Sequence, residues 1–173
     1  MSNIWFTADQ HFDHENIIKY CNRPFGSVHK MNKEIIKRYQ EVVKPQDIVY
    51  FIGDLSLRTS EHIRYYYKLI TQLPGQKHLI LGNHDSLKPF TYIDVGFTSV
   101  HTSLIVDDYI LNHDPASSCV IHNSIWLCGH VHDLFKTCKN VINVGVDVWD
   151  FYPVSLSQIQ EISKGLIYDN ITS

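Results

Sequence analysis

The chain has 173 residues, of which 44% are hydrophobic, which is enough to bury one sizeable core and predicts a single domain over residues 1–173. Fifteen Lys and Arg residues against eighteen Asp and Glu residues give a net charge of −3, so no basic face for duplex nucleic acid is expected, whereas a small phosphate-bearing substrate is compatible with this charge. The sequence shows no secretory leader, no membrane-spanning run and no Cys-x-x-Cys pair, which predicts a cytoplasmic protein with reduced thiols and no membrane segment.

The first half of the chain alternates apolar runs with segments of helical periodicity. In chain order it predicts a strand at 4–8, a short helix beginning near residue 15, a helix at 29–43, a strand at 48–52, a helix at 60–73 and a strand at 78–81. Ile48–Ile52 is an unbroken apolar run, typical of a strand buried on both faces of a parallel sheet. This alternation favours crossover connections with helices on the faces of the sheet.

The second half of the chain is richer in strands. It predicts strands at 102–106, 109–112, 125–128 and 141–144 and a last helix near 157–162. Asp107 and Asp108 join the first two of these strands in a tight hairpin, and Ser155 and Gln158 can form a capping box for the helix. The predicted fold class is α/β, with two mixed β-sheets packed as a sandwich flanked by helices. Loops from several strand ends then meet at one edge, where open α/β sheets bind their ligands.

Polar side chains follow most of these strands. They are two aspartates, one asparagine and four histidines, namely Asp9, His11, Asp54, Asn83, His113, His130 and His132. Such groups are costly to bury without partners, and a cation supplies those partners. Carboxylate, amide and imidazole donors without a thiolate favour a borderline divalent ion, and seven donors exceed what one tetrahedral ion uses. The sequence therefore predicts two metal ions that share a ligand, for which Asp54 is the best candidate.

Three glycines accompany these side chains. Gly53, Gly82 and Gly129 each directly precede a predicted functional residue. Glycine permits backbone angles and close approaches that a side chain would obstruct. The simpler alternative is that these glycines only end strands at turns. Their matching positions favour the interpretation that the backbone packs closely around a site.

In order along the chain, the polar residues and glycines form five blocks: Asp9-x-His11, Gly53-Asp54, Gly82-Asn83-His84-Asp85, His113 and Gly129-His130-x-His132. This set resembles the calcineurin-like metallophosphoesterase superfamily, in particular its small bacterial, archaeal and phage members. The blocks span residues 9–132, and the Asn-Val-Gly-Val-Asp segment at 143–147 is also similar to compact members. The resemblance implies a four-layer α/β/β/α fold.

The resemblance also implies the composition of a metal centre. Asp9, His11, Asp54 and His132 would hold one ion, and Asp54, Asn83, His113 and His130 would hold the other. Both would be divalent transition metals, with manganese as the first choice and iron, zinc, nickel or cobalt as alternatives. Two ions roughly 3.5–4 Å apart can share a hydroxide that attacks a phosphoryl group. In this mechanism His84 assists the leaving group, and Asp85 orients and charges its imidazole.

Two further residues are candidates for substrate binding. Arg58 carries a guanidinium fork that matches phosphate oxygens, and His14 lies in the loop after Asp9, which must pass the metal ions. Each residue also has a structural alternative. Arg58 can simply solvate a helix start, and His14 can lead into the short helix that begins near Glu15.

The predicted function is hydrolysis of phosphodiester bonds, with nucleotide-type molecules as the first choice of substrate, because an acid at His84 helps alkoxide leaving groups most. A phosphomonoesterase using the same site is the first alternative. A non-catalytic binding module of the same fold is the second, but such modules lose metal ligands and here every ligand position is filled. A mononuclear zinc hydrolase built on His130, His132 and one carboxylate would leave Asp54 and Asn83 unexplained.

Overall fold

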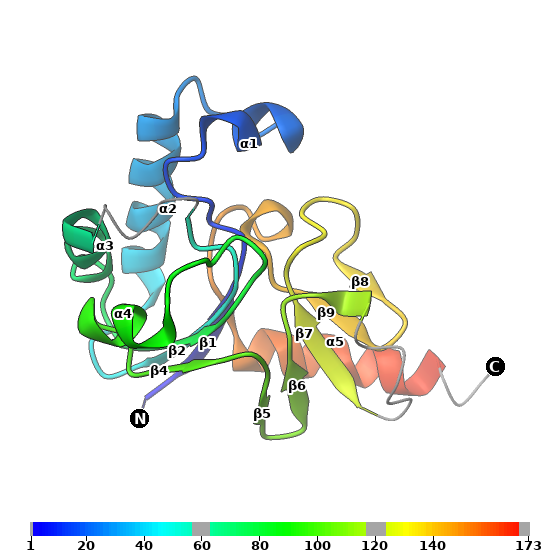
Figure 1. Ribbon diagram of the computed structural model, residues 1–173. Coiled ribbons are helices and arrows are strands. Elements are labelled where there is room, and N and C mark those ends of the chain that lie inside the picture. Colours follow the sequence, from blue (N-terminus) through cyan, green and yellow to red (C-terminus); the bar gives the residue numbers. More distant parts are fainter. Residues whose placement is uncertain (1, 57–62, 117–123, 170–173) are drawn as a thin grey trace.

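The computed structural model describes residues 2–56, 63–116 and 124–169. This part of the chain forms two five-stranded mixed sheets, with strand orders β10-β1-β2-β3-β4 and β5-β6-β7-β9-β8, and helices packed beside them (Figure 1). The predicted α/β fold with two mixed sheets is confirmed. Within the described ranges, no helix combines the length and the apolar composition needed to span a bilayer.

The first sheet brings three strand ends to one edge. It consists of β1 (Ile4–Thr7), β2 (Ile48–Ile52), β3 (Gln76–Ile80), β4 (Ser99–His101) and β10 (Val154–Ser155). The first four strands are parallel, and β10 pairs antiparallel with β1. The register pairs Thr7 with Phe51 and Ile52 with Ile80, so the carboxyl ends of β1, β2 and β3 lie together.

The second sheet contributes two more strand ends. It consists of β5 (Leu104–Val106), β6 (Tyr109–Leu111), β7 (Ile125–Cys128), β8 (Thr137–Cys138) and β9 (Val141–Asn143). Strands β5 and β6 form the predicted antiparallel hairpin, whereas β6, β7 and β9 are parallel. Leu111 pairs with Leu127, so β6 and β7 also end side by side.

The predicted helices are present in the predicted order, and short helices that were not predicted lie among them. They are α1 (Glu15–Tyr20), α2 (Val28–Val42), α3 (Ile63–Ile70), α4 (Pro89–Asp94), the 3₁₀ helix η3 (Val146–Val148) and α5 (Leu156–Asp169). The helix predicted at 60–73 corresponds to α3, although residues 60–62 lie outside the described ranges. The predicted capping box of α5 is present, since the Ser155 N–H donates to Gln158 Oε1 at 2.9 Å and the Gln158 N–H donates to Ser155 Oγ at 3.3 Å. The helix continues beyond the predicted end at 162.

Alternating side chains of the first sheet supply two hydrophobic cores. Phe51 on β2 packs in the core that includes Met31 of α2 and Tyr66 of α3, and α2, α3 and α4 cover this face of the sheet (Figure 1). The next residue, Ile52, faces the opposite way and packs in the core between the sheets with Leu127 of β7. Because both faces of β2 are buried, its unbroken apolar run is explained.

Several short elements were not predicted from the sequence: α4, β4, β8, β10 and η3. Each contains between two and six residues, which is too short for a recognisable period. Strands β4, β8 and β10 form because a neighbouring strand supplies hydrogen-bond partners, as β10 does alongside β1. Tertiary pairing therefore decides these elements rather than local propensity.

Asp47 fixes the start of the first sheet on the side opposite the strand ends. Its carboxylate accepts hydrogen bonds from the N–H of Asn3 at 2.9 Å, the N–H of Lys44 at 2.9 Å and Nε1 of Trp5 at 3.0 Å. Burial favours the neutral acid, but the hydrogen bonds from Asn3, Lys44 and Trp5 outweigh it and hold the pKa of Asp47 below its ordinary value. The ionised carboxylate thus joins the chain before β1 to the turn before β2.

We predict that Asp47→Ala lowers the free energy of unfolding of the metal-free protein at pH 7 by about 1–3 kcal/mol, because three donors lose their acceptor. Urea unfolding measures this difference, and Asp108→Ala, which removes an exposed carboxylate in the β5–β6 turn, serves as the control. Because the pKa of Asp47 is lower in the folded than in the unfolded protein, its ionised carboxylate stabilises the fold above about pH 4. This stabilisation is lost as the pH falls further. The difference between wild type and Asp47→Ala should therefore shrink as the pH falls through this range, and a constant difference would contradict the assignment.

Candidate metal centre

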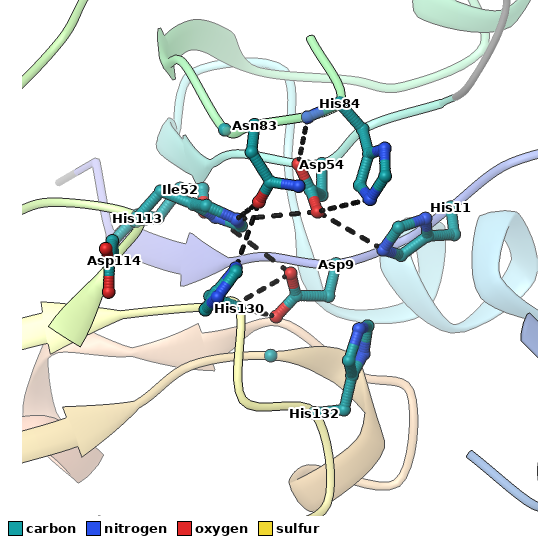
Figure 2. Close-up of polar contacts among 12 residues, drawn as sticks. Asp9, His11, Ile52, Asp54, Asn83, His84, His113, Asp114, His130 and His132 are labelled. Atoms are coloured by element: carbon teal, nitrogen blue, oxygen red, sulfur yellow. Dashed lines mark hydrogen bonds and ion pairs between the residues drawn. The ribbon is translucent and has the colours of Figure 1, made fainter. Parts of the chain in front are cut away.

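Five strand ends place the predicted metal ligands around one point. Asp9 and His11 follow β1, Asp54 follows β2, Asn83 follows β3, His113 follows β6, and His130 and His132 follow β7. Figure 2 shows these side chains pointing toward one another from loops of both sheets. The strand registers explain the convergence, because β1, β2 and β3 end together and β6 and β7 end together.

Asp54 lies in the middle of this cluster. Its Oδ2 is 3.4 Å from Nε2 of His11, 3.4 Å from Nε2 of His113 and 3.9 Å from Nε2 of His84. Burial favours the neutral acid, but the contacts with His11 and His113 outweigh it and hold the pKa of Asp54 far below its usual range. Asp54 is therefore a carboxylate, which is the form that a shared metal ligand requires.

Asn83 faces two imidazoles on one side of Asp54. Its Oδ1 lies 2.9 Å from Nδ1 of His130 and 3.1 Å from Nε2 of His113. The other ring nitrogen of His113, Nδ1, lies 2.8 Å from the carbonyl oxygen of Ile52, which can only accept a hydrogen bond. Nδ1 therefore carries a proton, and in the neutral ring Nε2 presents its lone pair toward the centre of the cluster.

Asp9 lies on the other side of Asp54 and is fully buried. Burial raises the pKa of Asp9 to about 6, so the carboxylate lacks the solvation that an ionised acid normally has. Asp9 belongs to two groups whose ligand atoms all lie within 4.8 Å of one another: Asp9, His11 and His132, and Asp9, Asp54 and His113. Each group combines carboxylate oxygen with imidazole nitrogen, as a divalent cation requires.

The ring of His11 supports a cation at this point of the cluster. Its Nε2 is buried and makes no hydrogen bond to any of the described residues, although Oδ2 of Asp54 is only 3.4 Å away. A buried ring nitrogen without a partner is costly. A metal ion between this nitrogen and the carboxylate would satisfy both atoms, so the residues present fit a divalent transition metal.

Backbone strain is concentrated at the same residues. Five of the seven predicted metal ligands have a positive φ: Asp9 (58°), His11 (50°), Asp54 (55°), His130 (73°) and His132 (48°). Residues with a side chain rarely adopt this left-handed conformation, and they keep it only where the surrounding structure enforces it. Strain of this kind clusters at functional sites, which is an argument for function that does not depend on the chemistry of the side chains.

The predicted close approach at the glycines is confirmed. Gly53 has φ +81°, and a Cβ there would collide with Nδ1 of His113 and lie 2.6 Å from Cα of Gly82. A Cβ on Gly82 would collide with the Asp54 carboxylate, and one on Gly129 would lie 2.8 Å from Oδ2 of Asp9. The loops that carry the metal ligands thus pack at distances that exclude side chains.

Asp85 makes different contacts from those expected. The resemblance implied that it orients the imidazole of His84. Its Oδ2 instead accepts hydrogen bonds from the N–H groups of Asp54 at 2.8 Å and Gly82 at 2.9 Å, and its Oδ1 accepts one from the N–H of Leu55 at 3.1 Å. The carboxylate therefore turns toward the backbone donors of two neighbouring loops, where its burial is compensated by hydrogen bonds. Asp85 joins the loop after β2 to the loop after β3.

His84 lies at the rim of the cluster. Its backbone N–H donates to Oδ1 of Asp54 at 2.9 Å, while its side chain is 43% exposed. Its ring centroid lies 5.4 Å from that of His11 (Figure 2). The backbone of His84 is thus fixed by Asp54, whereas its imidazole is accessible to solvent.

Of the two predicted substrate-binding residues, the structure describes only His14. His14 is half-buried directly before α1, and its Nδ1 lies 3.3 Å from Nδ1 of His11, so it borders the cluster and leads into the helix. Arg58 lies outside the described residues.

Two residues beside the cluster have buried side chains and were not predicted as functional from the sequence. Asp147 belongs to the 143–147 segment that resembles compact relatives, and this resemblance was the available signal. Arg23 has no such signal, because it lies in an ordinary stretch after α1. The structure brings them together as an ion pair with Nε of Arg23 2.7 Å from Oδ1 of Asp147.

Comparison with known proteins connects this geometry to a family. Residues 2–155 match the family model described as calcineurin-like phosphoesterase. An uncharacterized protein of Methanocaldococcus jannaschii is 36% identical, over 99% of this chain and 97% of its own length. The gene 66 protein of Mycobacterium phage D29 is 26% identical, over 96% of this chain and 100% of its own length.

Solved structures share the fold. A protein of unknown function from Aquifex aeolicus has a TM-score of 0.72 and 25% identity, covering 94% of this chain and 100% of that chain. The nuclease MPE of Pseudomonas putida has a TM-score of 0.52 and 16% identity, covering 75% of this chain and 61% of that chain. At this low identity the second likeness concerns the fold alone.

We predict that Gly82→Ala weakens metal binding, because the new Cβ displaces the Asp54 carboxylate, and that it destabilises the metal-free protein by about 1–3 kcal/mol through overpacking. Calorimetric titration with Mn²⁺ and urea unfolding measure the two effects. Gly165→Ala in α5 is the matched control, since its Cβ would meet no atom within 4 Å. Unchanged Mn²⁺ affinity in Gly82→Ala would contradict the proposed crowding at Asp54.

Proposed function

This chain belongs to the calcineurin-like phosphoesterase family, and we propose that it hydrolyses phosphodiester bonds of nucleotide-type substrates with the help of two divalent metal ions. The observation that carries this proposal is the arrangement of His84 above Asp54. An exposed imidazole stands at the edge of a cluster in which buried carboxylates and imidazoles meet more exposed amide and imidazole groups. Such an arrangement provides both a place for cations and a proton donor for a leaving group.

The residues of the cluster divide into two sets around Asp54. Asp9, His11, Asp54 and His132 would hold one ion, and Asp54, Asn83, His113 and His130 would hold the other. Manganese is our first choice, and iron, zinc, nickel and cobalt suit the same donors. When bound, two such ions polarise a phosphoryl group, make water nucleophilic near neutral pH and stabilise developing negative charge.

The protein's own contribution is to fix these donors and to handle the proton of the leaving group. The Ile52 carbonyl determines which nitrogen of His113 faces the centre, and Asp85 holds together the loops that carry Asp54 and His84. The hydrogen bond from the His84 N–H to Asp54 fixes its backbone beside the cluster, from where the exposed ring would reach a bound substrate. His84 then donates a proton to the departing oxygen.

The identity of the leaving group favours a diester substrate. A diester of a nucleotide releases an alkoxide, which is a poor leaving group and benefits most from a proton donor. A phosphomonoesterase would use nearly the same site and is the alternative. The name of the Pseudomonas putida nuclease describes that protein's activity on nucleic acid and is compatible with our proposal, but the proposal rests on His84.

We predict that the Mn²⁺-loaded protein hydrolyses bis(p-nitrophenyl) phosphate faster than p-nitrophenyl phosphate, measured as kcat/KM under identical conditions. Dinucleotides, cyclic nucleotides and short single strands extend the comparison to natural chemistry, since the net charge of −3 does not favour duplexes. A clear preference for the monoester would replace the diesterase proposal with the phosphomonoesterase alternative.

We predict that His84→Ala lowers kcat for a dinucleotide by roughly 10²–10⁴-fold and lowers kcat for an activated aryl diester much less, because a good leaving group does not need a proton. Both ions should still bind, as calorimetry with Mn²⁺ can show. His29→Ala, which removes an exposed imidazole from α2, is the control. Equal losses on the two substrates would rule out the proton-donor role.

A further inference from the structure

A fully buried ion pair lies directly behind the metal cluster. The side chains of Arg23 and Asp147 are 0% and 3% exposed, and they come from positions 124 residues apart. Nε of Arg23 donates to Oδ1 of Asp147 at 2.7 Å, and Nη2 donates to Oδ2 at 2.8 Å. This bidentate geometry fixes the carboxylate in one orientation.

The guanidinium of Arg23 also holds the loop after β1. Nη2 donates to the carbonyl oxygen of Asp9 at 2.7 Å, and Nη1 donates to that of Gln10 at 3.0 Å and to Sδ of Met31 at 3.4 Å. With the two bonds to Asp147, these contacts use all five N–H donors of the side chain. Arg23 therefore holds the backbone of Asp9 by a hydrogen bond. Asp9 is a predicted metal ligand, and its backbone has a strained left-handed conformation.

Asp147 in turn holds the ring of His132. Oδ2 of Asp147 lies 3.1 Å from Nδ1 of His132. An ionised carboxylate can only accept, so Nδ1 carries the proton and Nε2 of the neutral ring is left to bind a cation. A carboxylate behind an imidazole in this way fixes both the orientation and the tautomer of a metal ligand.

Stability alone is a poor explanation for this ion pair. A buried pair often contributes no more to stability than apolar residues of similar volume, because both charges must be desolvated. The pair also does not form a separate metal site with Cys21, although ligand atoms of Cys21, His132 and Asp147 lie within 4.8 Å of one another. Both oxygens of Asp147 already accept from a cationic guanidinium, which repels a metal ion.

We propose that Arg23 and Asp147 are positioning residues for one of the two metal sites, the one formed by Asp9, His11, Asp54 and His132. This inference rests on the proposed two-metal function. Arg23 holds the backbone of Asp9, and Asp147 holds the ring of His132. A single ion pair thus positions two of the four predicted ligands of this site. At the other site, the ring of His113 is held by the Ile52 carbonyl and not by this ion pair.

The test measures the two sites separately by calorimetric titration with Mn²⁺. In an Asn83→Ala background the ion held by His132 is measured, and adding Asp147→Asn should raise its Kd by about 10- to 100-fold. In a His11→Ala background the other ion is measured, and the same addition should leave its Kd unchanged. Arg23→Lys, which keeps the charge but loses the fork, should reproduce this selectivity if Asp147→Asn folds poorly.

Arg38→Lys is the matched control. Arg38 stacks on the same ring of Phe151 as Arg23, at 5.7 Å against 5.8 Å, and pairs with Asp150 at 2.8 Å, but it contacts none of the predicted metal ligands. Its replacement should leave both Kd values unchanged.

Three outcomes would overturn the inference. An unchanged Kd at both sites, or an equal rise at both sites with a matching loss of unfolding stability, would mean that the pair is not selective for one site. If the wild-type protein binds two ions in either case, the proposed function stands and only the positioning role fails. A wild-type protein that binds no Mn²⁺ would overturn both.

Discussion

Buried negative charge is the constraint around which the strand-end loops are built. Asp9 and Asp54 are 0% and 2% exposed, and water cannot solvate either carboxylate well. In the metal-free protein His113 helps to balance this charge: burial opposes a proton on its ring, but Asp54 and Asp9 outweigh burial and raise the pKa of His113 to about 9. Divalent cations supply the same compensation more directly, so that metal binding displaces protons from the cluster. Binding of a cation and release of protons from the cluster are therefore coupled.

The backbone must be held from outside the cluster, because most of the predicted metal ligands have a strained backbone conformation. Asp85 accepts three backbone N–H groups from the loops after β2 and β3, and the close contact of Gly53 with Gly82 locks the same loops side by side. Arg23 does the equivalent for the loop after β1 through two carbonyl oxygens. The left-handed conformation of Asp54 persists because its own N–H and the loop around it are fixed by these contacts. Hydrogen bonds remote from any substrate thus hold the predicted ligand atoms in a fixed arrangement.

Sequence patterns predicted what depends on local periodicity and on strand ends. The run Ile48–Ile52 matched β2, and the polar residues after the strands were brought together because parallel strands end at a common edge. Short strands such as β10 escaped prediction because their hydrogen bonds come from a distant partner. The same reason hid the pairing of Arg23 with Asp147, which are separated by 124 residues. Asp85 was assigned to His84 because the two are adjacent in sequence, but backbone N–H groups across the fold were better partners for its carboxylate.

The two proposed metal sites are not equivalent, and the difference follows from charge. Asp9 and Asp54 both contribute carboxylates to the site that includes His132, whereas the site that includes His113 has only Asp54 and completes its set with an amide and imidazoles. The ring of His132 is backed by the carboxylate of Asp147 at 3.1 Å, while that of His113 is backed by a neutral carbonyl at 2.8 Å. A carboxylate behind an imidazole increases its strength as a donor, and a second carboxylate strengthens the attraction for a divalent cation. We therefore expect the more negative of the two proposed sites to bind a divalent cation more tightly than the other.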